Sequence, residues 1–186
     1  MRRAGDPVHH RGHVAAAAQV PMSVPGWLIG LLLPACAAVG ARGLPHPPLR
    51  DMTRIERPAT PNTALAAPAD FVPKPDLPTP VYPVPAAVLF AALRAVASAQ
   101  PRTYLAAAYP DHGQLHWVVR SAFWNFPDRV TGQVLADGAH AARLILYSAS
   151  VYGYGDLGVN RRRLKVWLAA LAAVVPAPLP EGPPHG

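Results

Sequence analysis

The residues best suited to chemistry lie in one glycine-rich run between Ser148 and Arg163, SASVYGYGDLGVNRRR. Its glycines allow backbone conformations that other residues avoid, and Asp156 and Asn160 can satisfy free amides of a turn. Three consecutive cations, Arg161 to Arg163, stand where a helix is expected to begin. Exposed cations there oppose the helix dipole by about 0.3–1 kcal/mol each, so we expect an anionic partner nearby.

Two kinds of anion fit this cluster. A protein carboxylate, Asp128 or Asp156, or simple projection of the arginines into solvent would make the cluster structural, and this is the more common arrangement. A bound phosphate or lipid headgroup, held by helix amides and guanidinium groups, would make it functional. On the functional interpretation, the predicted ligand-binding residues are Tyr154, Asp156, Asn160, Arg161, Arg162 and Arg163.

Catalytic and metal-binding interpretations have less support. The sequence contains no H-E-x-x-H, G-x-S-x-G, P-loop or G-x-G-x-x-G pattern. A hydrolase triad would require Ser150 and Asp156 to meet His112, His116 or His140, and no spacing favours this. A metal site across a hairpin would require Asp111, His112 and His116. We therefore predict no catalytic residue, no metal and no cofactor.

The formal net charge of +7 raises the question of nucleic acid, because clustered Lys and Arg bind phosphate chains. Many of the basic residues precede residue 58, and Arg161 to Lys165 is the one cluster in the region that follows. No aromatic residues alternate with these cations, as they do in proteins that stack single-stranded bases. We expect no nucleic-acid partner.

An apolar stretch from Trp27 to Val39 lies between a basic segment and a run of small residues. It is shorter than the ~20 residues of a membrane-spanning helix, and this order of segments is typical of an export signal. Residues 33–36, LPAC, resemble the lipobox of bacterial lipoproteins, in which Cys36 would carry lipid. Ordinary cleavage at the A-x-A site, residues 35–37, is the alternative. Residues 1–41 therefore predict export to the cell envelope, either periplasmic or anchored to the membrane.

The run from Ser148 to Leu171 resembles the C-terminal signature of the domain-of-unknown-function family 1499. In that signature a strand ending in S-x-S precedes G-x-x-D-L-G-V-N-R-x-R and a helix. The matching positions are Ser148, Ser150, Gly153, Asp156, Leu157, Gly158, Val159, Asn160, Arg161 and Arg163. Residues 57–63, RPATPNT, resemble the family's C-P-x-x-P-N-C motif, with Arg57 and Thr63 at the cysteine positions. The resemblance covers roughly residues 57 to 175 and implies an exported or membrane-associated protein, but no activity.

Proline divides the chain into parts. The sequence holds 24 Pro, far above the average of about 5%, and most lie between residues 45 and 85 or from residue 176 onward. We therefore predict an extended Pro-rich tether over residues 42–82 and a disordered Pro-rich tail over residues 176–186. Within the tether, residues 60–63 and 71–72 are the candidates for packing on the domain. The folded domain is expected to span residues 83–175.

Periodicity predicts the elements that must position the candidate site. One amphipathic helix is expected from Pro85 to the stop at Pro101, and another after an N-cap at Asn160. Between them, alternation and turn residues predict strands over residues 103–109, 115–126, 130–135 and 143–151. Such a series predicts an α+β fold, a small two-layer sandwich of an antiparallel sheet with two flanking helices.

These observations together predict an envelope-associated, non-catalytic domain. It would bind an anionic small molecule or a partner protein at the glycine-rich strand-to-helix run, and would meet the membrane through a lipid anchor. A hydrolase acting on envelope or lipid substrates is one alternative, and a purely structural scaffold is another.

Overall fold

The computed structural model describes residues 40–176. The predicted export segment with Cys36 and nearly all of the predicted tail lie outside these residues. Within the described range, no helix has both the length and the apolar character that crossing a membrane requires.

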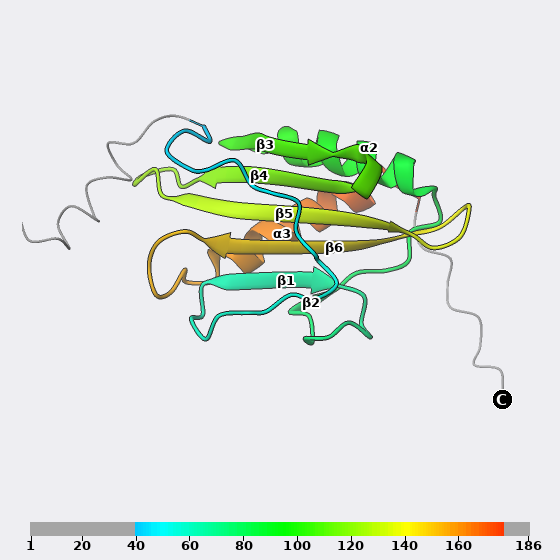
Figure 1. The fold of residues 1–186 in the computed structure, drawn as a ribbon, viewed down its shortest axis with the longest axis horizontal. Helices are drawn as coiled ribbons and strands as arrows, with labels where there is room; N and C mark the ends of the chain where they lie inside the picture. The colour runs from blue at the N-terminus through cyan, green and yellow to red at the C-terminus, as the bar shows by residue number, and fades with distance from the viewer. Residues whose placement is uncertain (1–39, 177–186) are drawn as a thin grey trace, which may run out of the picture.

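Six strands of the described range form one sheet, in the order β2-β1-β6-β5-β4-β3 (Figure 1). All neighbouring strands are antiparallel except the parallel pair β1 and β2. A 3-10 helix, η1, Pro110–His112, joins β3 to β4. The bounds are β1 Thr63–Ala67, β2 Leu77–Pro78, β3 Thr103–Tyr109, β4 Gln114–Arg120, β5 Pro127–Ala136 and β6 Ala142–Ser150.

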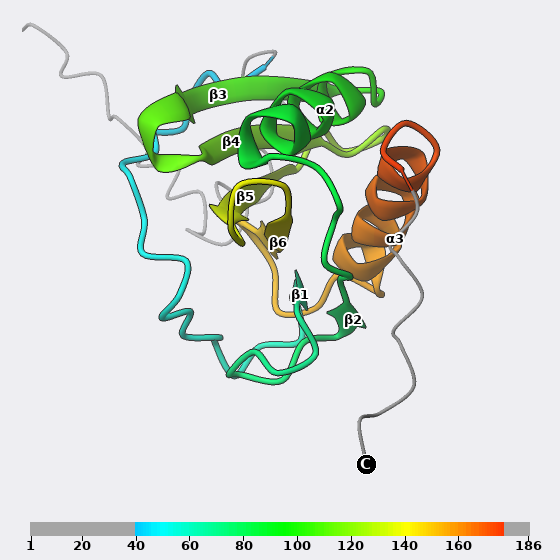
Figure 2. The same cartoon turned by 90° about the vertical axis from the view of Figure 1, so that its right-hand side faces the viewer.

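Two helices, α2 Ala86–Ser98 and α3 Val159–Ala172, cover one face of this sheet (Figure 2). The main core lies between them and the sheet, where the rings of Trp117 and Trp167 meet edge to face at 5.2 Å. Gly132 fits this tight layer because a Cβ atom there would lie 2.9 Å from a methyl group of Leu93. The predicted α+β two-layer sandwich is therefore confirmed.

Residues 42–82 differ from the extended tether that the prolines predicted, because they contribute β1 and β2 to the sheet. β1 pairs with β6 from Thr63 opposite Ala149 to Ala66 opposite Leu146. The chain before β1 crosses the sheet face opposite the helices (Figure 2). There Met52 and Ile55 are buried against side chains of β1 and β6 in a second apolar cluster. The folded part therefore begins well before residue 83.

The predicted elements of the domain agree with the structure in kind and differ at some ends. The strand predicted over residues 103–109 has the same bounds as β3. The strand predicted over 115–126 ends at Arg120, because residues 121–126 turn back on themselves, with Ser121 N donating to Phe126 O. That turn connects β4 to β5 in an antiparallel hairpin.

Candidate functional site

Asn160 is the centre of a buried hydrogen-bond network behind the glycine-rich run. Its Nδ2 donates to Asn62 O at 2.9 Å and to Ser150 Oγ at 3.0 Å, while its Oδ1 accepts from Ser148 Oγ. The side chain is fully buried. Asn160 therefore joins the start of α3 to β6 and to the chain that enters β1.

The prediction of Asn160 as N-cap is wrong. The N-cap position belongs to Gly158, which has a φ of 75° that suits glycine. The carboxylate of Asp156 accepts from Gly158 N at 2.9 Å and from Asn160 N at 2.8 Å. Asp156 thus supplies the oxygens that cap α3. Because Asn160 lies inside the helix and its side chain is not needed as a cap, that side chain can bond to groups of β6 and of the chain before β1.

Arg163 is bound by protein groups. Its guanidinium pairs with Asp128 of β5 at 2.5 Å, and the two side chains are 10% and 9% exposed. The Nη1 group donates to Ser148 Oγ and Asn160 Oδ1. For Arg163 the carboxylate partner is therefore Asp128, as in the structural alternative.

Arg161, Arg162 and Tyr154 face solvent instead. Arg161 Nη2 donates weakly to Asp76 O at 3.3 Å, and Arg162 Nη1 donates to Leu157 O at 3.1 Å. Among residues 40–176, no carboxylate forms an ion pair with Arg161 or Arg162. The six predicted ligand-binding residues therefore divide into three that maintain the fold and three that remain accessible.

Exposed apolar and aromatic side chains occur in the loop that precedes the accessible cations and in a turn at the same end of the sheet as that loop. Leu157 is 93% exposed and Tyr154 74% exposed, both in the loop between β6 and α3. The turn between β4 and β5 lies at the same end of the sheet, since Asp128 pairs with Ser150. This turn carries Phe123 and Trp124, which are also exposed and pack edge to face at 5.3 Å. We call this end of the sheet, residues 121–126 and 151–162, the aromatic-basic end.

The structure does not bring the residues of a catalytic triad together. Ser150 Oγ accepts from Asn160 Nδ2, and the Asp156 carboxylate accepts from Gly158 N and Asn160 N. Within residues 40–176, no histidine bonds to either side chain. In the same range, no group of three His, Cys, Asp or Glu side chains is arranged to hold a metal ion. Asp111 and His112 lie in η1, whereas His116 lies in the middle of β4.

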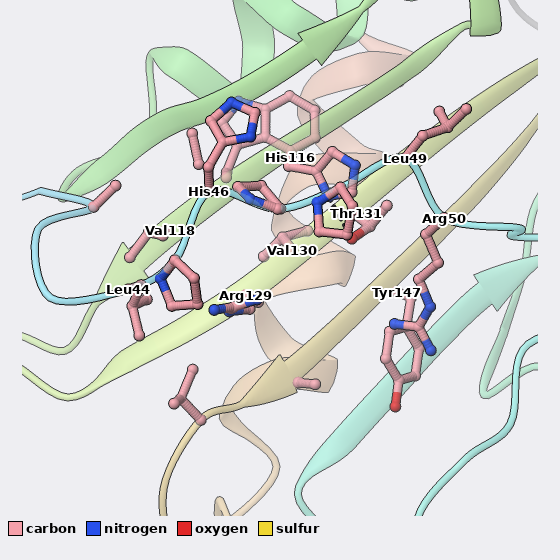
Figure 3. Close-up of a pocket in the computed structure, with 18 of the residues that line it drawn as sticks. Leu44, His46, Leu49, Arg50, His116, Val118, Arg129, Val130, Thr131 and Tyr147 are labelled. Atoms are coloured by element: carbon pink, nitrogen blue, oxygen red, sulfur yellow. Dashed lines mark hydrogen bonds between the residues drawn. The ribbon is translucent and has the colours of Figure 1, made fainter.

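A cavity of about 540 Å³ lies on the sheet face opposite the helices (Figure 3). Its roof is residues 40–50, which we call the strap, and its floor is the middle of β4, β5 and β6. Most of the lining is apolar. The basic side chains that line it are His46, Arg50, His116 and Arg129, and no Asp or Glu is among the described residues that line it.

Sequence reasoning missed this cavity because its roof was assigned to the tether. One signal was present in β5, where alternation places Arg129 and Thr131 on the face opposite Val130. A cation on a buried sheet face indicates that something polar lies over that face.

His116 lies in this cavity floor as a neutral imidazole. Its Nε2 lies 2.7 Å from Gln114 Oε1, and its Nδ1 lies 3.2 Å from Thr131 Oγ1. Burial is the main cause that lowers the pKa of His116 from 6.5 to about 4, and the charges of Arg50, His46 and Arg129 add to this effect.

His116 should make folding sensitive to mild acid. Between pH 6.5 and about 4 the unfolded chain binds a proton at this histidine while the folded protein does not. Its contribution to stability is therefore complete above pH 6.5 and is lost as the pH falls, with a slope of at most about 1.4 kcal/mol per pH unit. Urea denaturation of wild type and His116→Gln across this range measures the difference. Parallel stability curves for the two proteins would contradict the assignment.

The two residues at the cysteine positions of the RPATPNT motif lie in contact. Arg57 Nη2 is 3.4 Å from Thr63 Oγ1, and the same group pairs with Asp76 at 2.9 Å. Asp76 also accepts from Leu65 N at 2.8 Å. In this chain an ion pair and hydrogen bonds therefore hold the entry to β1 beside the loop that leads to β2.

Comparisons with known proteins give one family and two distant structural likenesses. The structure is similar to the di-domain ARO/CYC BexL from the BE-7585A biosynthetic pathway, at 13% identity and a TM-score of 0.41, covering 60% of this chain and 45% of that chain. It is also similar to Ara h 8.0201, at 11% identity and a TM-score of 0.39, covering 60% of this chain and 96% of that chain. No curated protein matches the chain at a significant level. The model of the family described as "Protein of unknown function (DUF1499)" matches residues 55–171, which include β1 to β6, α2, all but the last residue of α3 and the Asn160 network, and the chain therefore belongs to this family.

Proposed function

We propose that the protein is a non-catalytic, envelope-associated domain that binds anionic lipid headgroups with its aromatic-basic end. The observation that carries this proposal is the pair Arg161 and Arg162, which lack a carboxylate partner within residues 40–176 and follow a loop that carries exposed Tyr154 and Leu157. The small-anion site first expected at the helix N-terminus has less support. Asp156 already accepts from two amides there, and Asp128 neutralises Arg163.

The mixture of side chains at this end suits a membrane surface. Aromatic rings favour the interfacial region of a bilayer, where their apolar bodies and polar edges are both solvated. An anionic leaflet attracts a cation near its surface by about 1 kcal/mol. Phe123, Trp124 and Tyr154 would enter the headgroup region while Arg161 and Arg162 pair with phosphates.

The place where the described chain begins also supports this orientation. Gly40 O accepts from Arg120 Nε at 2.9 Å, and Arg120 is the last residue of β4, next to the exposed turn. A lipid on Cys36 would lie four residues before Gly40 in the sequence. An anchor there would hold the aromatic-basic end toward the bilayer.

The double variant Arg161→Ala/Arg162→Ala should bind vesicles that contain phosphatidylglycerol about 30-fold more weakly than wild type, because two cations lose roughly 1 kcal/mol each. Co-sedimentation of the full chain with these vesicles measures the effect. Vesicles of phosphatidylcholine alone should bind both proteins weakly, and raising the salt concentration should reduce the difference.

The matched control is Arg54→Ala/Arg94→Ala, which removes the same charge from exposed positions outside residues 121–126 and 151–162. An equal loss in both double variants would attribute binding to net charge rather than to the aromatic-basic end. Equal binding of all three proteins would contradict the proposal outright.

A further inference from the structure

We propose that the cavity between the strap and the sheet binds a single-chain amphiphile with an anionic head. The head would pair with Arg129, and the apolar chain would lie along the cavity wall beneath Leu44 (Figure 3). This inference is independent of the vesicle-binding proposal, because it uses neither Arg161 nor Arg162 and needs no membrane.

Arg129 differs from every other shielded arginine of residues 40–176. Four other arginines there are buried or half-buried, and each has polar partners: Arg57 with Asp76, Arg120 with three carbonyls, Arg143 with Asp70 and Asp137, and Arg163 with Asp128. Arg129 is half-buried, and within the described range its guanidinium has no ion pair and no hydrogen bond. A partly desolvated guanidinium favours an anionic acceptor.

The surroundings of Arg129 add positive charge and no negative charge. Arg50, on the strap, places its guanidinium 5.0 Å from the ring centre of Tyr147, and His46 lies on the same segment. No carboxylate is among the described residues that line the cavity. An anion is therefore the charge that this site would accept, and a cationic ligand would be repelled.

The roof keeps the cavity open. Pro45, Pro47 and Pro48 stiffen the strap, so it spans the floor without collapsing onto it. Both ends are fixed: Arg120 binds the carbonyls of Gly40 and Arg42, and Gln114 bonds to both backbone groups of Arg50. Between these ends, Tyr109 OH donates to Pro47 O at 2.8 Å.

The size and lining of the cavity suit an alkyl chain. Its volume of about 540 Å³ lies within the range of about 300–1,000 Å³ that is typical of small-molecule sites. Leu44 from the strap and Val118 and Val151 from the sheet region supply apolar contacts. A free anion such as inorganic phosphate would use Arg129 but leave these contacts unmade.

Dodecyl phosphate, below its micellar concentration, is the probe. Isothermal titration calorimetry with the full chain should show binding, whereas Arg129→Gln should bind about 10- to 100-fold more weakly, the range expected for loss of a charged hydrogen-bond donor. Arg94→Gln, on the exposed face of α2, is the matched control and should bind like wild type. Dodecanol and inorganic phosphate should each bind wild type more weakly than dodecyl phosphate.

A second variant, Ala149→Phe, should also reduce binding. Ala149 pairs with Arg129 across β5 and β6 and lines the cavity, so a larger side chain there fills the space beside the guanidinium. Thermal melting without ligand verifies that each variant is folded.

Several results would overturn the proposal. One is failure of the full chain to bind dodecyl phosphate, and this outcome includes the case in which the chain's own residues 27–39 occupy the cavity. Another is binding of dodecyl phosphate by folded Arg129→Gln as tightly as by wild type. Equally tight binding of dodecanol would remove the role of the anion, and equally tight binding of inorganic phosphate would remove that of the chain. The vesicle variant Arg161→Ala/Arg162→Ala should retain dodecyl phosphate binding, so the two proposals can fail separately.

Discussion

Replacing Asp128 with Ala should lower the free energy of unfolding by about 3–5 kcal/mol, because it leaves a buried guanidinium without its counter-ion. Arg163 is only 10% exposed in its side chain, so water cannot take the place of the lost carboxylate. The change lies on β5 under α3, where the Asn160 network joins the helix to the sheet. Urea denaturation followed by tryptophan fluorescence measures the effect, because Trp117 and Trp167 are buried in the same core.

Two further variants separate the buried charge from other causes. In Asp128→Ala/Arg163→Met the stranded cation is removed, while Ser148 Oγ can still donate to Asn160 Oδ1, so most of the lost stability should return. Asp137→Ala breaks the exposed ion pair with Arg143 and should cost no more than about 1 kcal/mol. A double variant no more stable than Asp128→Ala would show that the uncompensated charge is not the source of the loss.

The fold between residues 86 and 172 could be predicted because the helices there carry a helical period and the strands are apolar or alternating segments bounded by turn residues. α3 repeats buried Leu164, Trp167 and Leu171 at helical spacing, and β3 ends at Tyr109, directly before Pro110. β1 carries no such signal, since TALAA is buried on both faces and shows no alternation. The second face is buried because Met52 and Ile55 cover it, and that contact depends on chain far from any periodic segment.

For the candidate site, the sequence could predict which residues take part but not which partners they contact. The spacing of Asn160 and Arg163 places both side chains on one helix face, but it does not say whether that face meets solvent or the sheet. Their partners Ser148 and Asp128 come from two strands, and register cannot be derived from the sequence when both strands are largely buried on both faces. The cavity depends on contacts between residues even farther apart in the sequence, such as the hydrogen bond from Arg120 to Gly40 O, which joins residues 80 positions apart.

Replacing Arg120 with Ala should release the strap from the sheet. The buried guanidinium donates to the carbonyls of Gly40, Arg42 and Asn125, at 2.9, 2.8 and 3.0 Å. Loss of these charged hydrogen bonds should lower the local stability of the strap by about 3 kcal/mol and speed hydrogen exchange at its amides by roughly 100-fold. Hydrogen-exchange mass spectrometry of peptides covering residues 43–50 measures this, with Arg94→Ala as the control for loss of an exposed cation.

The effect of Arg120→Ala should be local, in contrast to that of Asp128→Ala. Arg120 holds the strap from the end of β4, whereas the contacts between the two helices and the sheet do not involve it. Exchange in β5 and α3 should therefore change much less than exchange in the strap, and affinity for dodecyl phosphate should fall because the cavity loses its roof. If strap exchange stays at the wild-type rate, Tyr109 and Gln114 suffice to hold the roof, and Arg120 serves only the turn that follows it.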